Sequence, residues 1–102
     1  MHFVYIIYSS GFNKYYVGES VNAEERTNQH NIGYYNAAST SFANDWVLKL
    51  KLEIYSKTEA LKVERYIKSM KSKVFISRLI NEPSFLIVFK QLVKQKFQIE
   101  IT

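Results

Sequence analysis

The stretch HFVYIIYSSGFNKYYVGES, residues 2–20, decides the fold of this chain. Two runs rich in aromatic and β-branched residues flank SSGFN, a short connection that contains glycine. This pattern predicts two antiparallel strands joined by a hairpin. With the turn at residues 9–12, Tyr8 pairs with Asn13 and Tyr5 lies opposite Tyr16, so both phenols share one face of the sheet. A single strand tyrosine is most often a packing residue, so a functional interpretation needs further residues.

A third strand is predicted over residues 46–54, WVLKLKLEI, where apolar and polar residues alternate. The period of two indicates a strand with one buried face. The predicted buried residues are Trp46, Leu48, Leu50, Leu52 and Ile54.

A short helix is predicted near residues 22–32. Asn22 followed by Glu25 is typical of a helix start, and Gly33 is typical of a helix end. Arg26 and His30 stand four residues apart, which places them on one face of this helix.

A second helix is predicted over residues 57–71, because Ser56 and Glu59 form a capping-box pattern. Its predicted apolar stripe consists of Ala60, Val63, Ile67 and Met70. Glu64 projects at the edge of this stripe, and either an ion pair with Lys68 or a ligand role in a cleft would explain it.

The sequence therefore predicts one mixed α/β (α+β) domain with a small three-stranded antiparallel sheet flanked by helices. We expect residues 1–82 to form this domain and residues 83–102 to be a C-terminal extension packed on it. The extension has no assigned role. Its first part is compatible with helix or strand, and Phe97, Ile99 and Ile101 alternate like a strand.

Composition narrows the class of protein. The 102 residues include no cysteine and two histidines, which argues against disulfides and zinc, so any metal would be bound by oxygen. No apolar run approaches the roughly 20 residues of a membrane span, and we expect a cytoplasmic protein. Residues 56–78 carry a net charge of +5, equal to that of the whole chain. A localised basic stripe is expected of a protein that binds a phosphate backbone, although a solvated helix face is the commoner explanation.

Together these residues resemble the GIY-YIG nuclease family. The two halves of its motif correspond to FVY at residues 3–5 and YVG at 16–18, with ten residues between Tyr5 and Tyr16. The likeness continues through RTNQH at 26–30, DWVLKL at 45–50 and the segment 58–80. Among family members, the chain resembles the small single-domain bacterial ones.

The chain also departs from the family pattern. Phe3 and Val4 replace the Gly and Ile of the family name, and Thr27 stands where a leucine is frequent. The asparagine that larger members use after the glutamate has only Asn81 as a candidate.

The resemblance implies a metal-dependent endonuclease that hydrolyses DNA phosphodiester bonds. Glu64 would bind a divalent ion, Mg²⁺ or Mn²⁺, and Arg26 would contact a phosphate oxygen. Tyr16, with Tyr5 beside it, would orient or deprotonate the attacking water, and His30 would accept the proton. Gly18 would allow close approach of backbone at the strand end.

The basic residues of the second helix and just beyond it are expected to bind DNA rather than to take part in the chemistry. They are Lys62, Arg65, Lys68, Lys71 and Lys73. Two other functions are compatible with the sequence: a non-catalytic nucleic-acid-binding module on the same scaffold, and a structural or inhibitor protein whose basic face is only solvated.

Overall fold

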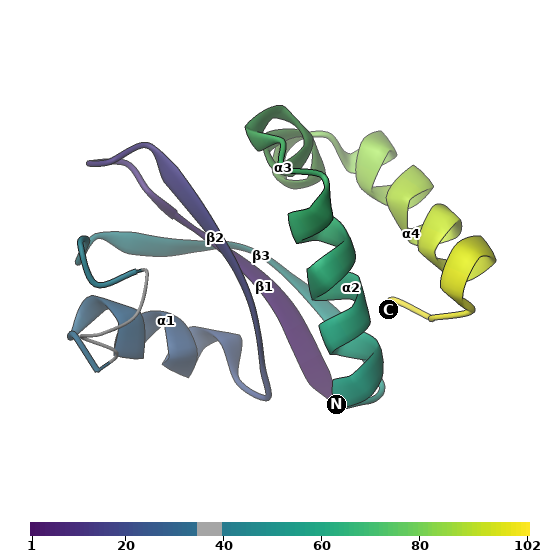
Figure 1. The fold of residues 1–102 in the computed structure, drawn as a ribbon, viewed down its shortest axis with the longest axis horizontal. Helices are drawn as coiled ribbons and strands as arrows, with labels where there is room; N and C mark the ends of the chain where they lie inside the picture. The colour runs from purple at the N-terminus through teal and green to yellow at the C-terminus, as the bar shows by residue number, and fades with distance from the viewer. Residues whose placement is uncertain (35–39) are drawn as a thin grey trace.

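The computed structural model describes residues 1–34 and 40–102. It contains a three-stranded antiparallel sheet and four helices, and it confirms the α+β class (Figure 1). The elements in chain order are β1 (His2–Ser9), β2 (Lys14–Ser20), α1 (Ala23–Asn31), β3 (Trp46–Ile54), α2 (Lys57–Ser69), α3 (Lys73–Asn81) and α4 (Pro83–Phe97). The strand order is β2-β1-β3, so β2 is an edge strand. No helix of the described residues combines the length and the apolar character needed to cross a membrane.

The hairpin between β1 and β2 forms, but its register differs from the predicted one by two residues. Tyr5 pairs with Gly18, and Tyr16 pairs with Ile7. The turn occupies residues 10–13 rather than 9–12, and it ends on Asn13 in the left-handed conformation (φ 52°). Because a two-residue shift keeps every side chain on its own face, Tyr5 and Tyr16 still share one face, as predicted.

β3 does not have the single buried face that its alternation predicts. Its pairing with β1 shifts between Ile6 and Ile7, which lie opposite Leu50 and Leu48. The extra residue of this bulge turns the start of the strand over. Leu50 and the later apolar residues pack with Ile6, whereas Trp46 and Leu48 pack on the other face with Tyr5 and Ile7.

The two predicted helices begin where the sequence indicates. The Asn22 side chain accepts from the Glu25 backbone N–H at 3.0 Å, and Ser56 accepts from Glu59 at 3.2 Å. At the end of α1, Gly33 has the positive φ (77°) that favours glycine after a helix. Met70 is 37 % exposed and caps α2, so it does not belong to the buried stripe.

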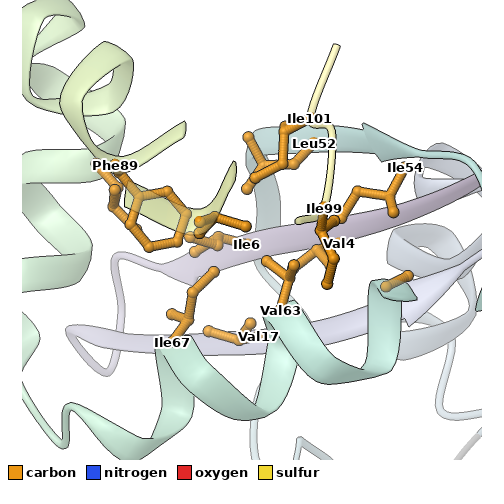
Figure 2. Close-up of a cluster of buried hydrophobic side chains, with 13 residues drawn as sticks. Val4, Ile6, Val17, Leu52, Ile54, Val63, Ile67, Phe89, Ile99 and Ile101 are labelled. Atoms are coloured by element: carbon orange, nitrogen blue, oxygen red, sulfur yellow. The ribbon is translucent and has the colours of Figure 1, made fainter. Parts of the chain in front are cut away.

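Helices lie on both sides of the sheet, α1 on one side and α2 with α4 on the other (Figure 1). The larger core cluster fills the α2 side, where Val63 and Ile67 pack under β1 and β2 (Figure 2). The C-terminal residues complete the same cluster, since Phe89 of α4 and Ile99 are buried in it.

The segment from residue 83 onward is a helix followed by a single bridge. Ile101 pairs with Ile54 at the end of β3, whereas Phe97 ends α4 and is not part of a strand. The sequence also gave no prediction of α3, which is capped by Ser72 through the Phe75 backbone N–H at 3.0 Å.

Candidate active site

Tyr5 occupies the centre of the smaller cluster, on the α1 side of the sheet. Its side chain is 1 % exposed and lies directly over its cross-strand partner Gly18. A Cβ atom at Gly18 would stand 2.5 Å from the Tyr5 hydroxyl oxygen and 2.6 Å from the ring carbon that carries it. Gly18 therefore makes room for the Tyr5 ring. The sequence predicts that backbone approaches closely at Gly18. In the structure it is the Tyr5 side chain that approaches the Gly18 backbone.

His30 connects Tyr5 to the helix α1. The histidine is buried, its Nε2 lies 3.0 Å from the Tyr5 hydroxyl, and its Nδ1 lies 2.7 Å from Oγ1 of Thr40. A neutral imidazole donates from one nitrogen and accepts at the other, so two hydroxyl partners suit it. Burial lowers the pKa of His30 below its usual value, and the charge of Arg26 lowers it further. Near neutral pH the ring is thus uncharged.

Thr40 is the residue that sequence reasoning missed. It is 1 % exposed, its hydroxyl contacts His30, and its backbone carbonyl accepts from the Trp46 indole N–H at 3.2 Å. Thr40 lies in a polar segment of small residues, and no periodicity or motif there distinguishes it from its neighbours.

The end of α1 is held to the start of β3. The Asn31 side chain donates to the Trp46 carbonyl at 2.8 Å and accepts from the Trp46 backbone N–H at 2.7 Å. Because His30 precedes Asn31, this double hydrogen bond also restrains the position of the His30 imidazole in the cluster.

Tyr16 completes the aromatic group. Its ring centroid lies 6.3 Å from that of Tyr5 and 5.1 Å from that of His30. Tyr16 belongs to the edge strand β2, which explains how a residue of α2, on the other side of the sheet, can reach it. Lys68 Nζ lies 5.5 Å from the centroid of the Tyr16 ring.

Glu64 accompanies Lys68 at this edge. Its carboxylate accepts from Lys68 Nζ at 2.8 Å, one turn along α2, and its side chain is 17 % exposed. The ion pair that the sequence allowed is therefore present. Lys68 links Glu64 to Tyr16, so the α2 carboxylate and the α1-side aromatic residues meet around the edge of β2.

A divalent ion is compatible with these donors. No three His, Cys, Asp or Glu side chains of the described ranges form a metal-binding group, so residues 1–34 and 40–102 hold no all-protein cage. Mg²⁺ is commonly bound by one or two carboxylates, with water and substrate phosphate as the remaining ligands. Glu64 is a partly exposed carboxylate of this kind.

The predicted DNA-binding residues lie in separate places. Lys62 and Arg65 lie with the aromatic rings near the end of α4, and Lys62 Nζ is 5.8 Å from the Phe97 ring centroid. Lys71 and Lys73 lie where α2 turns into α3, beside the tip of the β1–β2 hairpin. Lys68 alone contacts a site tyrosine.

Two further candidates, Asn81 and Arg26, lie in different parts of the structure. The Asn81 amide donates to the Ser77 carbonyl of its own helix at 2.9 Å, a local contact within α3. Arg26 is partly buried, lies one turn before His30, and lines a hollow of about 120 Å³ between α1 and the end of β2.

Comparison with known proteins adds one match. The model of the GIY-YIG catalytic domain matches residues 1–78, which extend from β1 into α3 and include both site tyrosines, His30 and Glu64. No curated protein and no solved structure gives a significant match. The observed sheet with its flanking helices agrees with the fold of that domain. Since the match covers most of the chain, this protein belongs to the GIY-YIG catalytic domain family.

Proposed function

We propose that this protein is a metal-dependent endonuclease that hydrolyses phosphodiester bonds of DNA. Members of its family are generally endonucleases that act on DNA. The observation that carries the proposal is the hydrogen bond between the Tyr5 hydroxyl and a buried, neutral His30, with Tyr16 packed against the same imidazole.

Hydrolysis requires a base that removes a proton from the attacking water. A phenol of reference pKa about 10 is a poor base at neutral pH, so Tyr16 is better suited to orient the water than to deprotonate it. The Lys68 ammonium lies beside the Tyr16 ring. We assign Tyr16 the role of orienting the water.

His30 is suited to accept the hydroxyl proton of Tyr5 at Nε2 while the Tyr5 oxygen takes up the proton that the water loses. Its neutral form has an acceptor nitrogen, and the Tyr5 hydroxyl lies within hydrogen-bond distance of Nε2. In this scheme Thr40 orients the ring through Nδ1, as the second hydroxyl partner. Thr40 is thus a positioning residue rather than a catalytic one.

Arg26 and Glu64 act on the charged groups. The guanidinium of Arg26 would bind a non-bridging phosphate oxygen, since its planar donors match that geometry. Glu64 would hold Mg²⁺ or Mn²⁺, which when bound stabilises negative charge on the phosphoryl and leaving oxygens. Substrate phosphate would then replace Glu64 as a partner of Lys68.

The non-catalytic binding module is the second candidate. The observation in its favour is the Glu64–Lys68 ion pair, which already neutralises the one carboxylate that the mechanism needs. In such a protein Glu64 would only stabilise α2, as i,i+4 pairs do by a few tenths of a kcal/mol.

The substitution Glu64→Gln separates the two functions, because glutamine keeps the shape of the side chain and removes its charge. The nuclease mechanism predicts a fall in Mg²⁺-dependent cleavage on the order of a thousandfold. DNA affinity in chelator and the melting temperature should change little. Glu100→Gln is the matched control, since it removes the carboxylate of another exposed ion pair, with Lys94, at the C-terminus.

A Glu64→Gln protein that cleaves labelled DNA as fast as the native chain would contradict the assigned site. A native protein that binds DNA but cleaves no substrate with Mg²⁺ or Mn²⁺ would identify the binding module.

A further inference from the structure

A cleft lies between the tip of the β1–β2 hairpin and the start of α3, apart from the aromatic cluster. It consists of two adjoining hollows of about 550 Å³ and 330 Å³. Both are lined by Asn13, Tyr15 and Lys73. Lys14 and Lys71 line the smaller hollow, and the Arg78–Glu82 ion pair lines the larger one.

The cleft carries an excess of positive charge. Arg78 and Glu82 neutralise each other at 3.1 Å, which leaves Lys14, Lys71 and Lys73. Over residues 1–34 and 40–102, no carboxylate forms an ion pair with any of these three lysines. Three uncompensated ammonium groups around one hollow favour a ligand with several negative charges.

The walls of the cleft are held in place by specific contacts. Lys73 Nζ donates to the Asn13 carbonyl at 2.7 Å, which joins the hairpin tip to α3. Asn13 and Lys71 both have the left-handed conformation, with φ of 52° and 47°. Residues other than glycine rarely adopt it, and at Lys71 it turns the chain sharply from α2 to α3.

An aromatic surface adjoins the lysines. The Tyr15 ring lines both hollows and packs against Tyr8 with centroids 4.7 Å apart. The Tyr8 hydroxyl donates to the Asn13 side chain at 2.6 Å, which ties this pair to the turn. Cations beside aromatic rings are the combination that nucleic-acid grooves present to a strand.

The cleft adjoins β2, the strand that carries Tyr16 of the candidate active site. Tyr15 and Tyr16 are neighbours on the edge strand β2 and point to opposite faces of the sheet. Lys68, which lies over the Tyr16 ring, belongs to α2, and Lys71 of the cleft follows the end of that helix. The cleft therefore borders the strand that carries the proposed water-orienting tyrosine, at the end of the helix that carries Glu64.

We propose that this cleft binds backbone phosphates of the DNA strand that flanks the scissile bond, with Lys14, Lys71 and Lys73 as the phosphate ligands. The proposal rests on the proposed function and deepens it: it states which surface the DNA strand contacts beyond the catalytic residues. It places Lys62 and Arg65 outside that path, because they line a separate hollow that shares no residue with the cleft.

The test compares two double variants that remove the same charge. The cleft variant, Lys14→Gln with Lys73→Gln, removes two lysines of the cleft. The control variant, Lys62→Gln with Arg65→Gln, removes two cations of the separate hollow beside Phe97. The affinity for fluorescent duplex DNA is measured by anisotropy in chelator over a range of salt concentrations, so that no cleavage occurs.

The cleft variant should lose about 1.8 units of the slope of log K against log salt, because each phosphate contact contributes roughly 0.9. Its affinity near 0.1 M salt should fall by a factor on the order of ten to a hundred. The control variant should keep the native slope. Lys14→Arg with Lys73→Arg should also keep it, which separates loss of charge from loss of structure.

Equal slopes for the cleft and control variants would overturn the proposal. So would inorganic phosphate that displaces the DNA at equal concentrations of phosphate groups, because the cleft would then be a site for a small free anion. If the native protein has no nuclease activity but the cleft variant still loses its salt slope, the binding proposal stands and only the catalytic one fails.

Discussion

Gly18→Ala tests whether the position of Tyr5 depends on the missing side chain beneath it. An added Cβ would lie 2.5, 2.6 and 2.8 Å from three atoms of the phenol, closer than the 3.0 Å that real Cβ contacts respect. Tyr5 has little room to move, since it is 1 % exposed and its hydroxyl is held by His30.

The expected loss of stability has two opposing contributions. Overpacking of a buried site costs about 1–3 kcal/mol. Alanine is better than glycine inside a strand by roughly 0.5–1 kcal/mol. The middle of each range gives a net loss of about 1 kcal/mol. In a domain of this size that lowers the melting temperature by about 4–8 °C. Thermal and urea unfolding measure it directly.

The same substitution should reduce cleavage, because Tyr5 can clear the new Cβ only by leaving its hydrogen-bond position on His30. We expect a fall in kcat with the salt dependence of DNA binding unchanged. Gly11→Ala is the comparison variant: its Cβ would approach the Asp45 carboxylate at 2.9 Å, so it introduces a similar clash at the hairpin turn and should leave kcat unchanged.

A second background decides whether the ring is the cause. In a Tyr5→Leu protein the phenol is absent, so Gly18→Ala should lose its penalty and become neutral or stabilising by roughly 0.5–1 kcal/mol. The same destabilisation in both backgrounds, or a Gly18→Ala protein as stable and active as the native one, would refute the reasoning.

Two further predictions concern His30. Thr40→Val leaves Nδ1 of the buried His30 ring without its hydroxyl partner, so we expect a loss of about 1–3 kcal/mol in stability and a lower kcat. Thr40→Ser keeps the hydroxyl and should preserve both stability and kcat. A Thr40→Val protein as active and stable as the native one would contradict the positioning role. Because the folded pKa of His30 is lowered, its contribution to stability is present above the unfolded pKa of about 6.5 and is lost as the pH falls through that value towards the folded pKa. Urea titrations should therefore show stability falling on acidification from about pH 7.5 to 5.5 in the native chain and falling less in His30→Gln, and parallel curves would disprove the assignment.

Local chemistry explains the correct part of the sequence-based prediction. The capping pairs Asn22–Glu25 and Ser56–Glu59 each form within one turn, so the start of both helices could be read from four consecutive residues. The shared face of Tyr5 and Tyr16 was predicted correctly despite a wrong register, because the error was an even number of residues.

Only the tertiary structure decided the rest. The bulge opposite Ile6 and Ile7 arises from the pairing of β1 with β3, far apart in sequence, and it moves Trp46 to the other face. The contact of Thr40 with His30 likewise joins two residues ten apart in sequence that no motif pairs. Caps and alternation are interactions between near neighbours, whereas a bulge and a buried hydroxyl partner are set by packing between distant segments, which no local pattern in the chain encodes.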